Sequence, residues 1–303
     1  MSTSLTGVFP VLPTPFDEHG APDEAALRRL VRFLLRCGVD GVTYPGVASE
    51  VGQLAHDEHV RLTYVVQDEV AGRRPVIAGA SSSDARTTVE LARAAAQAGA
   101  AAVMIAAPPD HPGHEGQIEF FAAVAAQVPV AVMLQNVPPP AGAGLDPDVV
   151  LDLLRAVPAI RYVKEETLPC GQRLTALRDG APATLLGVFG GAGGRYISDE
   201  LRRGAAGTMP AIELAEVHAA LFAAHRAGDE KRVRQLFTRM LPVLNTQAVF
   251  RWALTKYVLQ RRGLISCSLQ RAPGPRLDAF DRADVDAFLD DIADLLLPRE
   301  ALA

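Results

Sequence analysis

Residues 128–164 read VPVAVMLQNVPPPAGAGLDPDVVLDLLRAVPAIRYVK and contain one complete unit of strand, helix and strand. The two ends, 128–136 and 160–164, are short apolar runs that predict buried strands. Between them, residues 146–158 form an amphipathic stretch that predicts a helix. Two strands joined by a helix lie parallel in one sheet. The stretch therefore predicts an α/β fold whose parallel sheet is covered on both faces.

The same unit recurs along the first two thirds of the chain. Apolar runs that predict strands stand at 7–13, 38–46, 74–80, 101–108, 128–136, 160–164, 183–190 and 205–210. Helical patterns follow them, such as 23–38, which ends on a glycine. Eight units in roughly 220 residues predict an α/β fold of the (β/α)8 TIM barrel type, with a doubly wound open sheet as the structural alternative. The barrel is assigned to 1–212. Residues 213–303 carry helical patterns alone and predict a C-terminal helical extension.

The composition narrows the class of protein. The chain has 303 residues, of which 49% are hydrophobic, and a net charge of -5, so it has ample material for a large core. It lacks a run rich in Lys and Arg, which argues against nucleic acid as a partner. No apolar run approaches the roughly 20 residues of a membrane span, and the amino terminus lacks a secretory pattern. Cys37, Cys170 and Cys267 are widely spaced and indicate reduced thiols in a cytoplasmic protein.

One lysine stands out because lysine is rare in this chain. The sequence has three lysines and 27 arginines, and Lys164 ends the sixth predicted strand. In a TIM barrel the functional residues lie at the carboxyl ends of the strands. An amine at such an apolar mouth is desolvated, which disfavours its charged form. A neutral amine forms a Schiff base with ketones and aldehydes, whereas a guanidinium stays protonated and cannot do so.

The other interpretation of Lys164 is structural. A salt bridge with Glu165 or Glu166 would also explain a lysine at this position. Lys231 and Lys256 lie in charge-rich helical stretches, and we expect both to be solvated. Of the three lysines, Lys164 is thus the candidate nucleophile.

Several motifs, taken together, resemble one known family. They are GVFPVLPTPFDEHG (7–20), HDEH (56–59), RPVIAGAS (74–81), QNVPPPAG (135–142) and YVKEET (162–167). Across nearly the whole chain, helical tail included, they resemble the dihydrodipicolinate synthase / N-acetylneuraminate lyase superfamily of Schiff-base lyases and aldolases. The resemblance implies that Lys164 forms the imine. It also implies that backbone N–H groups of a turn containing Val47 and Ala48 hold the carboxylate of a 2-keto acid, a suitable anion cradle.

Two further expectations accompany this resemblance. The imine nitrogen accepts electrons in such chemistry, so no metal and no organic cofactor is expected. Members of the family are commonly homotetramers, so we expect a homo-oligomer, either a tetramer or a dimer. The expected partner is a small-molecule 2-keto acid, with no nucleic acid and no membrane.

The chain departs from the synthase pattern at the positions of the proton relay. Gln135 stands where the synthase and the lyase usually carry a tyrosine, and glutamine has no useful proton chemistry near neutral pH. Val47 and Ala48 stand where the synthase has paired threonines. Pro140 stands where the synthase has an arginine that grips the carboxylate of the second substrate. These departures point away from dihydrodipicolinate synthesis.

One branch of the superfamily fits these departures better. The sequence resembles the 2-keto-3-deoxy sugar acid dehydratases of the L-2-keto-3-deoxyarabonate type. This resemblance rests on Ser49, Glu50, Gln135, Lys164, Glu166, the GTM of 207–209 and LPVLN (241–245). In this chemistry an imine at C2 acidifies the C3 proton, a base removes that proton, and the C4 hydroxyl leaves as water.

Ser49 and Glu166 are the candidate acid–base groups, with Gln135 beside them. Glu166 stands two residues after Lys164, so both side chains face the same way if the strand continues. If the strand ends at Lys164, this argument fails, and Glu166 then serves as a salt-bridge or helix-capping carboxylate.

Five further residues are expected to bind substrate, because they stand in or after predicted strand ends. They are Asn136, Gly187, Thr208, Met209 and His111. The glycine-rich turn after the seventh strand suggests a close backbone approach to substrate, since no basic partner for a phosphate accompanies it. His111 and His114 could instead be solvated loop residues. HDEH (56–59) mimics a metal motif, but Asp and Glu favour a helix start there.

These observations lead to three hypotheses for the function. The first is a Schiff-base lyase that acts on a small 2-keto acid and dehydrates a 2-keto-3-deoxy sugar acid. The second is a pyruvate-dependent aldolase or a dihydrodipicolinate synthase-like enzyme. The third is a family member without turnover that binds a keto acid.

Overall fold

The computed structural model describes residues 4–111 and 113–298 of the chain. The strands are β1 (Gly7–Val8), β2 (Val42–Thr43), β3 (Val76–Gly79), β4 (Ala102–Ala106), β5 (Ala131–Asn136), β6 (Ile160–Glu165), β7 (Gly187–Gly190) and β8 (Gly207–Thr208). The helices are α1 (Glu24–Arg36), α2 (His56–Val70), α3 (Ala85–Gln97), α4 (Gly113–Ala125), α5 (Pro147–Ala156), α6 (Cys170–Gly180), α7 (Ile197–Arg202), α8 (Ala215–Arg226), α9 (Glu230–Phe250), α10 (Trp252–Arg261) and α11 (Ala279–Asp291).

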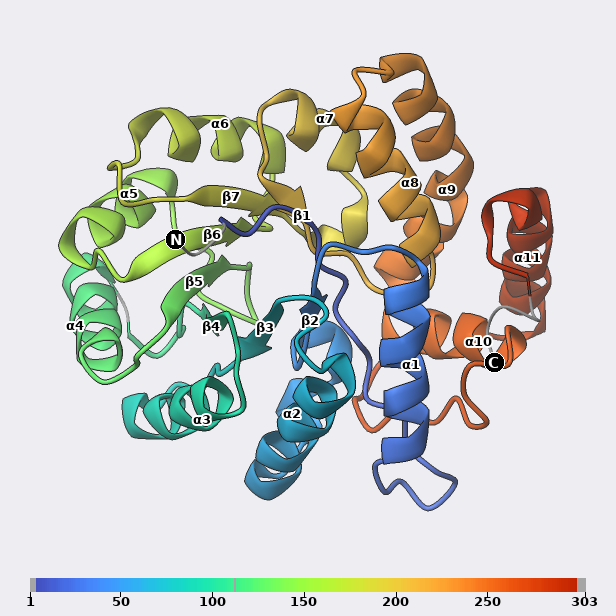
Figure 1. The fold of residues 1–303 in the computed structure, drawn as a ribbon, viewed down its shortest axis with the longest axis horizontal. Coiled ribbons are helices and arrows are strands. Elements are labelled where there is room, and N and C mark those ends of the chain that lie inside the picture. Colours follow the sequence, from blue (N-terminus) through green and yellow to red (C-terminus); the bar gives the residue numbers. More distant parts are fainter. Residues whose placement is uncertain (1–3, 112, 299–303) are drawn as a thin grey trace.

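The eight strands form one parallel sheet that closes on itself. Their order is β1-β8-β7-β6-β5-β4-β3-β2. The segment after β1 completes the circle, because Val11 forms a parallel bridge with Thr43 of β2. Helices surround the strands on the outside (Figure 1). The predicted (β/α)8 barrel is therefore confirmed, and the open doubly wound sheet is wrong.

The first strand is shorter than the apolar run 7–13 suggests. Pro10 and Pro13 have no backbone N–H, so they cannot donate to a sheet ladder. The chain nevertheless continues along the barrel wall, where the Val11 N–H donates to the Pro210 carbonyl at 2.7 Å. Proline thus limits the regular strand without moving this segment out of the barrel.

Side chains fill the interior of the barrel. Phe9 and Phe189 meet edge to face with ring centroids 5.7 Å apart, and Tyr162 packs against Phe189 at 6.1 Å. Met104 and Met133 belong to the same buried cluster. Because this core occupies the barrel axis, a ligand site has to form at the ends of the strands.

The helices begin where the sequence supplies acceptors. The Asp23 side chain accepts from the Ala26 N–H at the start of α1, and Asp84 accepts from the Thr87 N–H at the start of α3. Each acceptor satisfies an N–H that has no partner within its helix. The local sequence therefore explains where these helices start.

Two further observations concern the three cysteines and the lengths of the helices. Cys37, Cys170 and Cys267 are free thiols. Burial raises the pKa of the Cys170 thiol to about 12, so this thiol stays protonated near neutral pH. Within the described parts of the chain, no helix combines the length and apolarity that crossing a membrane requires.

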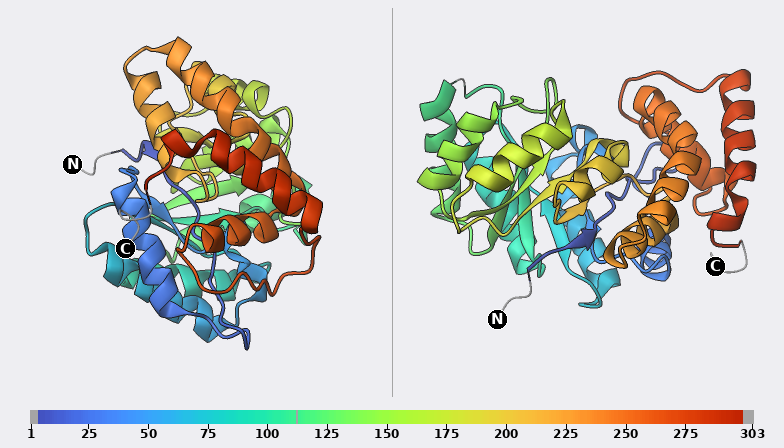
Figure 2. Two further views of the ribbon diagram at one scale, coloured as in Figure 1. Left: turned by 90° about the vertical axis from the view of Figure 1, so that its right-hand side faces the viewer. Right: turned by 90° about the horizontal axis from the view of Figure 1, so that it is seen from above.

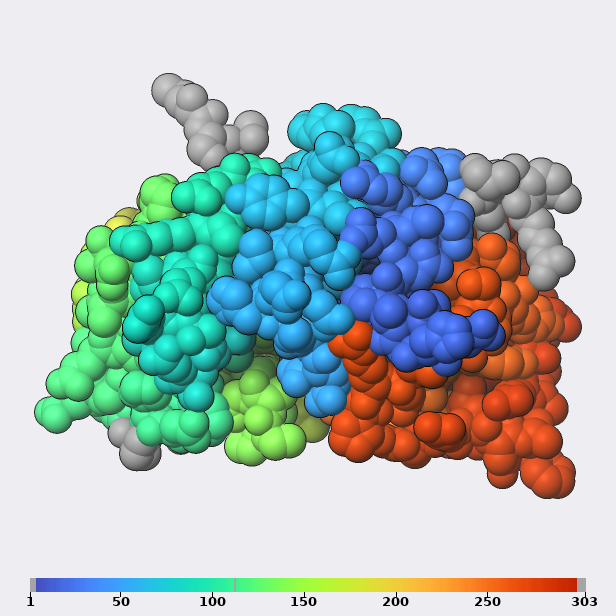
Figure 3. Space-filling view, turned by 90° about the horizontal axis from the view of Figure 1, so that it is seen from below, coloured from blue at the N-terminus to red at the C-terminus, as the bar shows by residue number. Residues whose placement is uncertain are grey.

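Helices α9, α10 and α11 form an extension at one side of the barrel (Figure 2). On the molecular surface this extension borders the N-terminal segment that contains α1 (Figure 3). Arg271 supports that contact, since it donates to the Gly20 carbonyl at 2.8 Å and pairs with Glu58 at 2.6 Å. Helix α8 contacts both β1 and α9 and so connects the two parts. The division into 1–212 and 213–303 stays a prediction.

Lys256 is buried, which corrects the expectation that it is solvated. It lies on α10 with 0% exposure, and its Nζ is 2.5 Å from Glu50 Oε1. The same Nζ donates to the Leu269 carbonyl at 2.7 Å and lies 4.2 Å from the ring centroid of Phe16. Lysine in a charge-rich helix is usually solvated, but here a carboxylate far away in the sequence compensates the buried charge. The expectation for Lys231 is confirmed, since it is exposed.

We expect Lys256→Met to lower the free energy of unfolding by about 3–5 kcal/mol, because it leaves the Glu50 carboxylate buried without its cation. Urea denaturation measures this loss. Lys231→Met, at an exposed position of α9, is the matched control and should change stability by less than about 0.5 kcal/mol.

The double variant Glu50→Gln/Lys256→Met should recover part of the loss, because it removes both charges. A loss below about 1 kcal/mol for Lys256→Met alone would contradict a stabilising role of this pair.

Candidate active site

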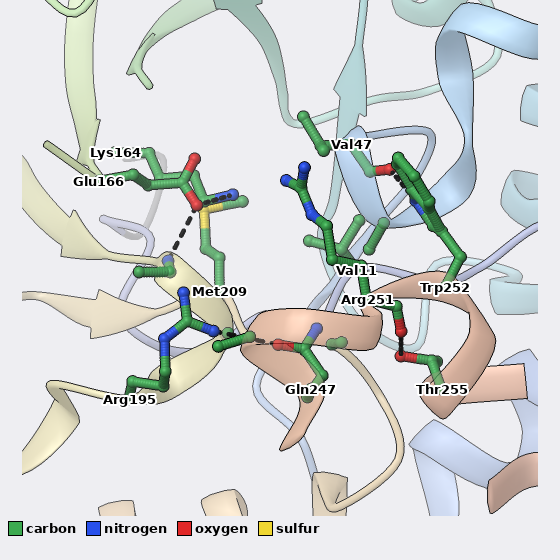
Figure 4. Close-up of a pocket in the computed structure, with 15 residues that line it drawn as sticks. Val11, Val47, Lys164, Glu166, Arg195, Met209, Gln247, Arg251, Trp252 and Thr255 are labelled. Carbon is green, nitrogen blue, oxygen red and sulfur yellow. Dashed lines mark hydrogen bonds and ion pairs between the residues drawn. The ribbon is translucent and has the colours of Figure 1, made fainter. Parts of the chain in front are cut away.

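A cavity of about 200 Å³ opens at the carboxyl ends of the strands, between the barrel mouth and the C-terminal extension. This is smaller than the roughly 300–1,000 Å³ typical of pockets for drug-sized ligands, so it suits a small molecule. Its lining comes from the barrel, from the turn after β7 and from α9 and α10 (Figure 4). The lining residues are Val11, Val47, Ala48, Lys164, Glu166, Ala192, Gly193, Arg195, Met209, Ala211, Gln247, Ala248, Arg251, Trp252 and Thr255.

Lys164 lies near the end of β6, and its side chain reaches this cavity. The residue is 4% exposed, so the amine is largely shielded from solvent. Its Nζ is 3.2 Å from Glu166 Oε1. The two interpretations of Lys164 therefore coincide, because the lysine forms a salt bridge and also faces a cavity.

Glu166 follows β6 directly and shares the cavity with Lys164 (Figure 4). The expectation that the two side chains face the same way is confirmed by their contact. The carboxylate accepts from Gln135 Nε2 at 2.7 Å and from the Ala192 N–H at 2.9 Å. Burial alone would raise the pKa of Glu166, but the charge of Lys164 and these hydrogen bonds outweigh burial and lower the pKa. Glu166 is therefore an anion held next to the amine.

Gln135 lies on β5 directly opposite Lys164 in the strand register. Its amide contacts Glu166, so it positions that carboxylate and acts on the site through it. Asn136, the next residue, faces elsewhere. Its amide donates to Glu165 Oε2 at 2.8 Å and accepts from the Leu145 N–H at 2.8 Å. Asn136 is not among the residues that line the cavity, and its expected role in substrate binding stays a prediction.

The turn after β2 forms part of the cavity wall. Val47 and Ala48 begin the short 3-10 helix η1 (Val47–Ser49), so their N–H groups have no acceptor within the helix. Both residues line the cavity, as expected for an anion cradle. The Val47 carbonyl accepts from Trp252 Nε1 at 2.7 Å, which attaches this turn to α10.

Ser49 forms hydrogen bonds within the turn, and its expected role as an acid–base group stays a prediction. Its Oγ donates to the Leu12 carbonyl at 2.5 Å and accepts from the Gly46 N–H at 2.8 Å. The hydroxyl is fully buried, and both of these bonds lie within the scaffold of the turn. A serine next to a glycine-containing turn looks reactive in sequence, and here it also shapes the turn.

The expected contacts at β8 divide into two cases. Met209 lines the cavity, as the sequence predicts. Thr208 is fully buried and is not among the residues that line the cavity. Its Oγ1 has no hydrogen-bond partner among the described residues.

Two other expected contacts lie outside the cavity. Gly187 begins β7 at the level of Tyr162, which is the end of the strand opposite to the mouth. The glycines that approach the site come later in the turn, and Gly193 is one of them. His111 binds the Ser83 carbonyl through Nε2 at 3.0 Å and packs against a phenylalanine, so it belongs to the outer loops.

The two other histidine motifs have structural roles. Helix α2 begins at His56, which confirms that HDEH is a helix start. His59 binds the Gly79 carbonyl at 2.9 Å. His114 lies 3.1 Å from Asp152 on the surface. Within residues 4–111 and 113–298, no group of three His, Cys, Asp or Glu side chains could hold a metal ion.

Sequence reasoning missed the polar residues that the extension and the turn after β7 contribute. Arg195 follows that glycine-rich turn directly, so the expectation that the turn has no basic partner is wrong. Trp252, Arg251 and Gln247 from the C-terminal helices also line the cavity. The position of Arg195 after a strand end could have revealed it. Nothing in the local sequence of α9 and α10 indicates that these helices reach the barrel mouth.

A buried carboxyl lies near the site without contacting the cavity. Glu200 of α7 is 1% exposed, and neither carboxyl oxygen has a hydrogen-bond partner among the described residues. Burial, followed by the charges of Glu166, Asp199 and Glu165, raises the pKa of Glu200 to about 8. Near neutral pH this carboxyl is therefore mostly protonated.

Comparison with known proteins identifies relatives along most of the chain. The model of the Dihydrodipicolinate synthetase family matches residues 4–292. The 4-hydroxy-tetrahydrodipicolinate synthase of Brucella abortus biovar 1 is 31% identical over 298 residues, which cover 93% of this chain and 96% of that protein. The synthase of the same name from Nitratidesulfovibrio vulgaris is 38% identical over 162 residues, so this match spans 53% of the chain and 55% of that protein.

Solved structures agree with these matches. Dihydrodipicolinate synthase from Rhodopseudomonas palustris superposes with a TM-score of 0.88 at 29% identity, covering 95% of this chain and 97% of that one. YagE from E. coli K12, a prophage protein of the dihydrodipicolinic acid synthase family solved in complex with pyruvate, gives a TM-score of 0.88 at 25% identity. That match covers 95% of this chain and 99% of YagE.

Glu200 makes stability depend on pH in a defined direction. The folded protein keeps its proton up to about pH 8, whereas an unfolded glutamate releases it near 4.5. Between these values the unfolded state binds fewer protons, so the free energy of unfolding falls as pH rises. Glu200→Gln removes this titration. Its stability relative to the native chain should rise by about 1 kcal/mol per pH unit across the window.

Urea denaturation at about pH 5, 6.5 and 8 measures this difference. Glu119→Gln, at an exposed position of α4, is the control and should give a difference that varies little with pH. A constant difference for Glu200→Gln would show that this carboxyl ionises normally in the folded state.

Proposed function

This chain belongs to the dihydrodipicolinate synthetase family, and on that premise we propose that it is a lyase that binds a small 2-keto acid as an imine on Lys164. One observation carries the proposal. A shielded lysine lines a small cavity at the barrel mouth, with a carboxylate 3.2 Å from its amine. An amine, a proton acceptor and an anion cradle are the parts that imine chemistry on a keto acid requires.

The chemistry begins at the carbonyl carbon C2. In the free site the ammonium of Lys164 gives a proton to Glu166, the nearest anion. The neutral nitrogen then attacks C2 and a C–N bond forms. Glu166 returns its proton as the carbonyl oxygen leaves as water, so a protonated imine stands beside an ionised carboxylate. The C1 carboxylate meets the N–H groups of Val47 and Ala48, which leaves C3 free to react. Protonation of the imine nitrogen draws electrons from C3 and acidifies its hydrogens.

Glu166 is the proposed base for the C3 proton. It lies beside the imine nitrogen, and Gln135 and the Ala192 N–H fix its orientation. Its lowered pKa keeps it ionised near neutral pH, so it can accept a proton. The resulting enamine carries its excess electrons on C3, the carbon at which the reaction diverges.

Addition of this carbon to an aldehyde is the outcome that the relatives favour. The Brucella abortus relative, which this chain covers almost completely, is named as a 4-hydroxy-tetrahydrodipicolinate synthase. YagE was solved with pyruvate, whose C3 is a methyl group suited to enamine formation. We therefore propose a pyruvate-dependent aldolase or synthase reaction, in which a C–C bond forms or breaks at C3.

Dehydration is the second candidate, and the contact between Gln135 and Glu166 favours it. Where the synthase pattern has a phenol, this site has an amide that only holds the carboxylate. A carboxylate can remove the C3 proton, after which a C4 hydroxyl leaves as water, and this step needs no phenol. A 2-keto-3-deoxy sugar acid carries the required C4 hydroxyl. Product analysis separates the candidates, because dehydration retains the carbon skeleton and aldol cleavage releases pyruvate.

We expect borohydride reduction in the presence of pyruvate to add one covalent adduct to the native chain, detected by intact mass, because borohydride reduces the imine to a stable amine. Lys164→Arg should abolish the adduct, since a guanidinium does not form an imine. Lys231→Arg is the matched control and should leave trapping unchanged.

An adduct that persists in Lys164→Arg would show that another lysine forms the imine. Trapping without turnover of any keto acid would instead favour a ligand-binding protein.

Glu166→Gln should lower kcat by about 10²- to 10⁴-fold, because an amide cannot accept the C3 proton. Trapping of pyruvate should still occur in this variant, since the amine remains, but more slowly, because the carboxylate that accepts the proton of Lys164 is lost. Kinetics with the keto acid that gives turnover, alongside borohydride trapping, measure the two effects separately. A kcat within about threefold of the native value would exclude Glu166 as the base.

A further inference from the structure

We infer that the substrate is a 2-keto diacid, whose distal carboxylate is held by Arg195 and Arg251. This inference rests on the proposed function, because it takes the keto-acid end of the substrate to be bound at Lys164. It concerns the side of the cavity that the turn after β7 and the extension form. No step proposed above uses either arginine.

Arg195 reaches the cavity from the turn after β7. It directly follows the 3-10 helix η3 (Ala192–Gly194), and its guanidinium faces the cavity near Met209 (Figure 4). Its Nη1 donates to Gln247 Oε1 at 3.1 Å, which is a neutral acceptor. The bond holds the guanidinium in place without neutralising its charge.

Arg251 reaches the cavity from the extension. It stands between α9 and α10 with φ 44° and ψ −111°, a conformation that is costly for a residue with a side chain. Its guanidinium lies 5.1 Å from the ring centroid of Trp252 and points into the cavity (Figure 4). Trp252 in turn is fixed by its bond to the Val47 carbonyl. The strained backbone thus directs a positive charge toward the barrel mouth.

Arg195 and Arg251 differ from two arginines of the extension, Arg262 and Arg271, which are ion-paired. Arg262 pairs with Glu216 in the interior, and Arg271 pairs with Glu58 at the barrel edge. In the part of the chain that the structure describes, no carboxylate lies within ion-pair distance of Arg195 or Arg251. Two unneutralised guanidinium groups that face one small cavity are a built receptor for an anion.

Glu213 is a nearby carboxyl, outside the cavity lining, that could neutralise the charge of Arg195. It is 1% exposed and bonded to Thr255 Oγ1 at 3.1 Å. Burial raises the pKa of Glu213 to about 7, with the charge of Arg195 opposing that rise. Glu213 therefore carries at most part of a negative charge near neutral pH, and it forms no ion pair with Arg195.

The charges of the cavity lining favour a ligand with a second anionic group. Lys164, Arg195 and Arg251 contribute positive charges to the cavity lining, and Glu166 contributes the negative one. The nitrogen of Lys164 remains positive as a protonated imine. The C1 carboxylate of a keto acid compensates one of the two excess positive charges, so one remains. A second carboxylate neutralises the site, whereas a doubly charged phosphate would reverse its sign.

The preferred test compares two keto acids of equal length. 2-Oxoadipate and 2-oxohexanoate have the same carbon chain and differ in the distal carboxylate. We measure the keto-acid concentration at which borohydride trapping reaches half of its maximum. We expect this concentration to be roughly tenfold lower, or lower still, for 2-oxoadipate than for 2-oxohexanoate. Arg195→Gln and Arg251→Gln should each reduce this ratio, and the double variant should bring it to within about twofold of unity. Arg232→Gln, an exposed position on α9, is the matched control and should retain the native ratio.

Two results would overturn the inference. One is a native ratio within about twofold of unity. The other is a preference for the diacid that survives in the double variant. A 2-keto acid with a terminal phosphate belongs in the same series, and tighter trapping of that compound than of 2-oxoadipate would also refute a carboxylate site.

Failure of the proposed function can be told apart from failure of this inference. Absence of any adduct, including one with pyruvate, contradicts imine formation at Lys164 and leaves the arginine pair open to a second measurement. Isothermal titration calorimetry of Lys164→Ala measures the affinity for the same two acids. Because this variant cannot form an imine, a difference between the two affinities reports the contacts with the distal carboxylate. A preference for 2-oxoadipate that both arginine substitutions remove supports the receptor, and equal affinities overturn it.

Discussion

The buried pair of Glu50 and Lys256 joins the two walls of the cavity. Glu50 ends the turn that carries the Val47 and Ala48 N–H groups, and it adopts a left-handed conformation with φ 57°. Lys256 belongs to α10, the helix that also presents Trp252. Because removal of one partner from a buried pair leaves an uncompensated charge, the turn and the helix are stable together and costly to separate. The barrel alone supplies the amine and the anion cradle, but the cavity needs the extension held against that cradle.

A second ion pair, Lys164 with Glu166, differs from the first because it faces the cavity. Its charges are also shielded from solvent, yet they face a space that a ligand can enter. Gln135 and the Ala192 N–H satisfy the carboxylate, so Glu166 stays in place when the lysine nitrogen becomes bonded to substrate. The same kind of ion pair therefore has two roles in this protein. Where no cavity is present it fixes the scaffold, and where a cavity is present we propose that it supplies a nucleophile and a base.

The sequence predicted those features that depend on local pattern. Alternating apolar runs and amphipathic stretches predicted the barrel, and the spacing of two residues predicted the contact between Lys164 and Glu166. Features that depend on contacts between distant segments could not be predicted. Lys256 looked solvated because its partner lies more than 200 residues away, and the hydrogen bond from Ser49 could not be predicted because its acceptor lies in the segment after β1. Arg251 stands between the tail helices α9 and α10, whose position at the mouth follows from packing alone.

The barrel strands and the surrounding segments contribute different residues to the cavity, and this difference affects how substrate specificity can change in this fold. The resemblance to the synthase placed its carboxylate-gripping arginine at Pro140, in the loop after β5, and that position holds no charge here. Arg195 and Arg251 restore positive charge to the cavity from other directions, across from the strand that carries Lys164. Imine chemistry constrains the amine and the cradle, because both act on the keto-acid end that every such substrate shares. The distal end has no such constraint, so a cation placed on a turn or a tail helix can select a new substrate while the reacting groups stay where the strands hold them.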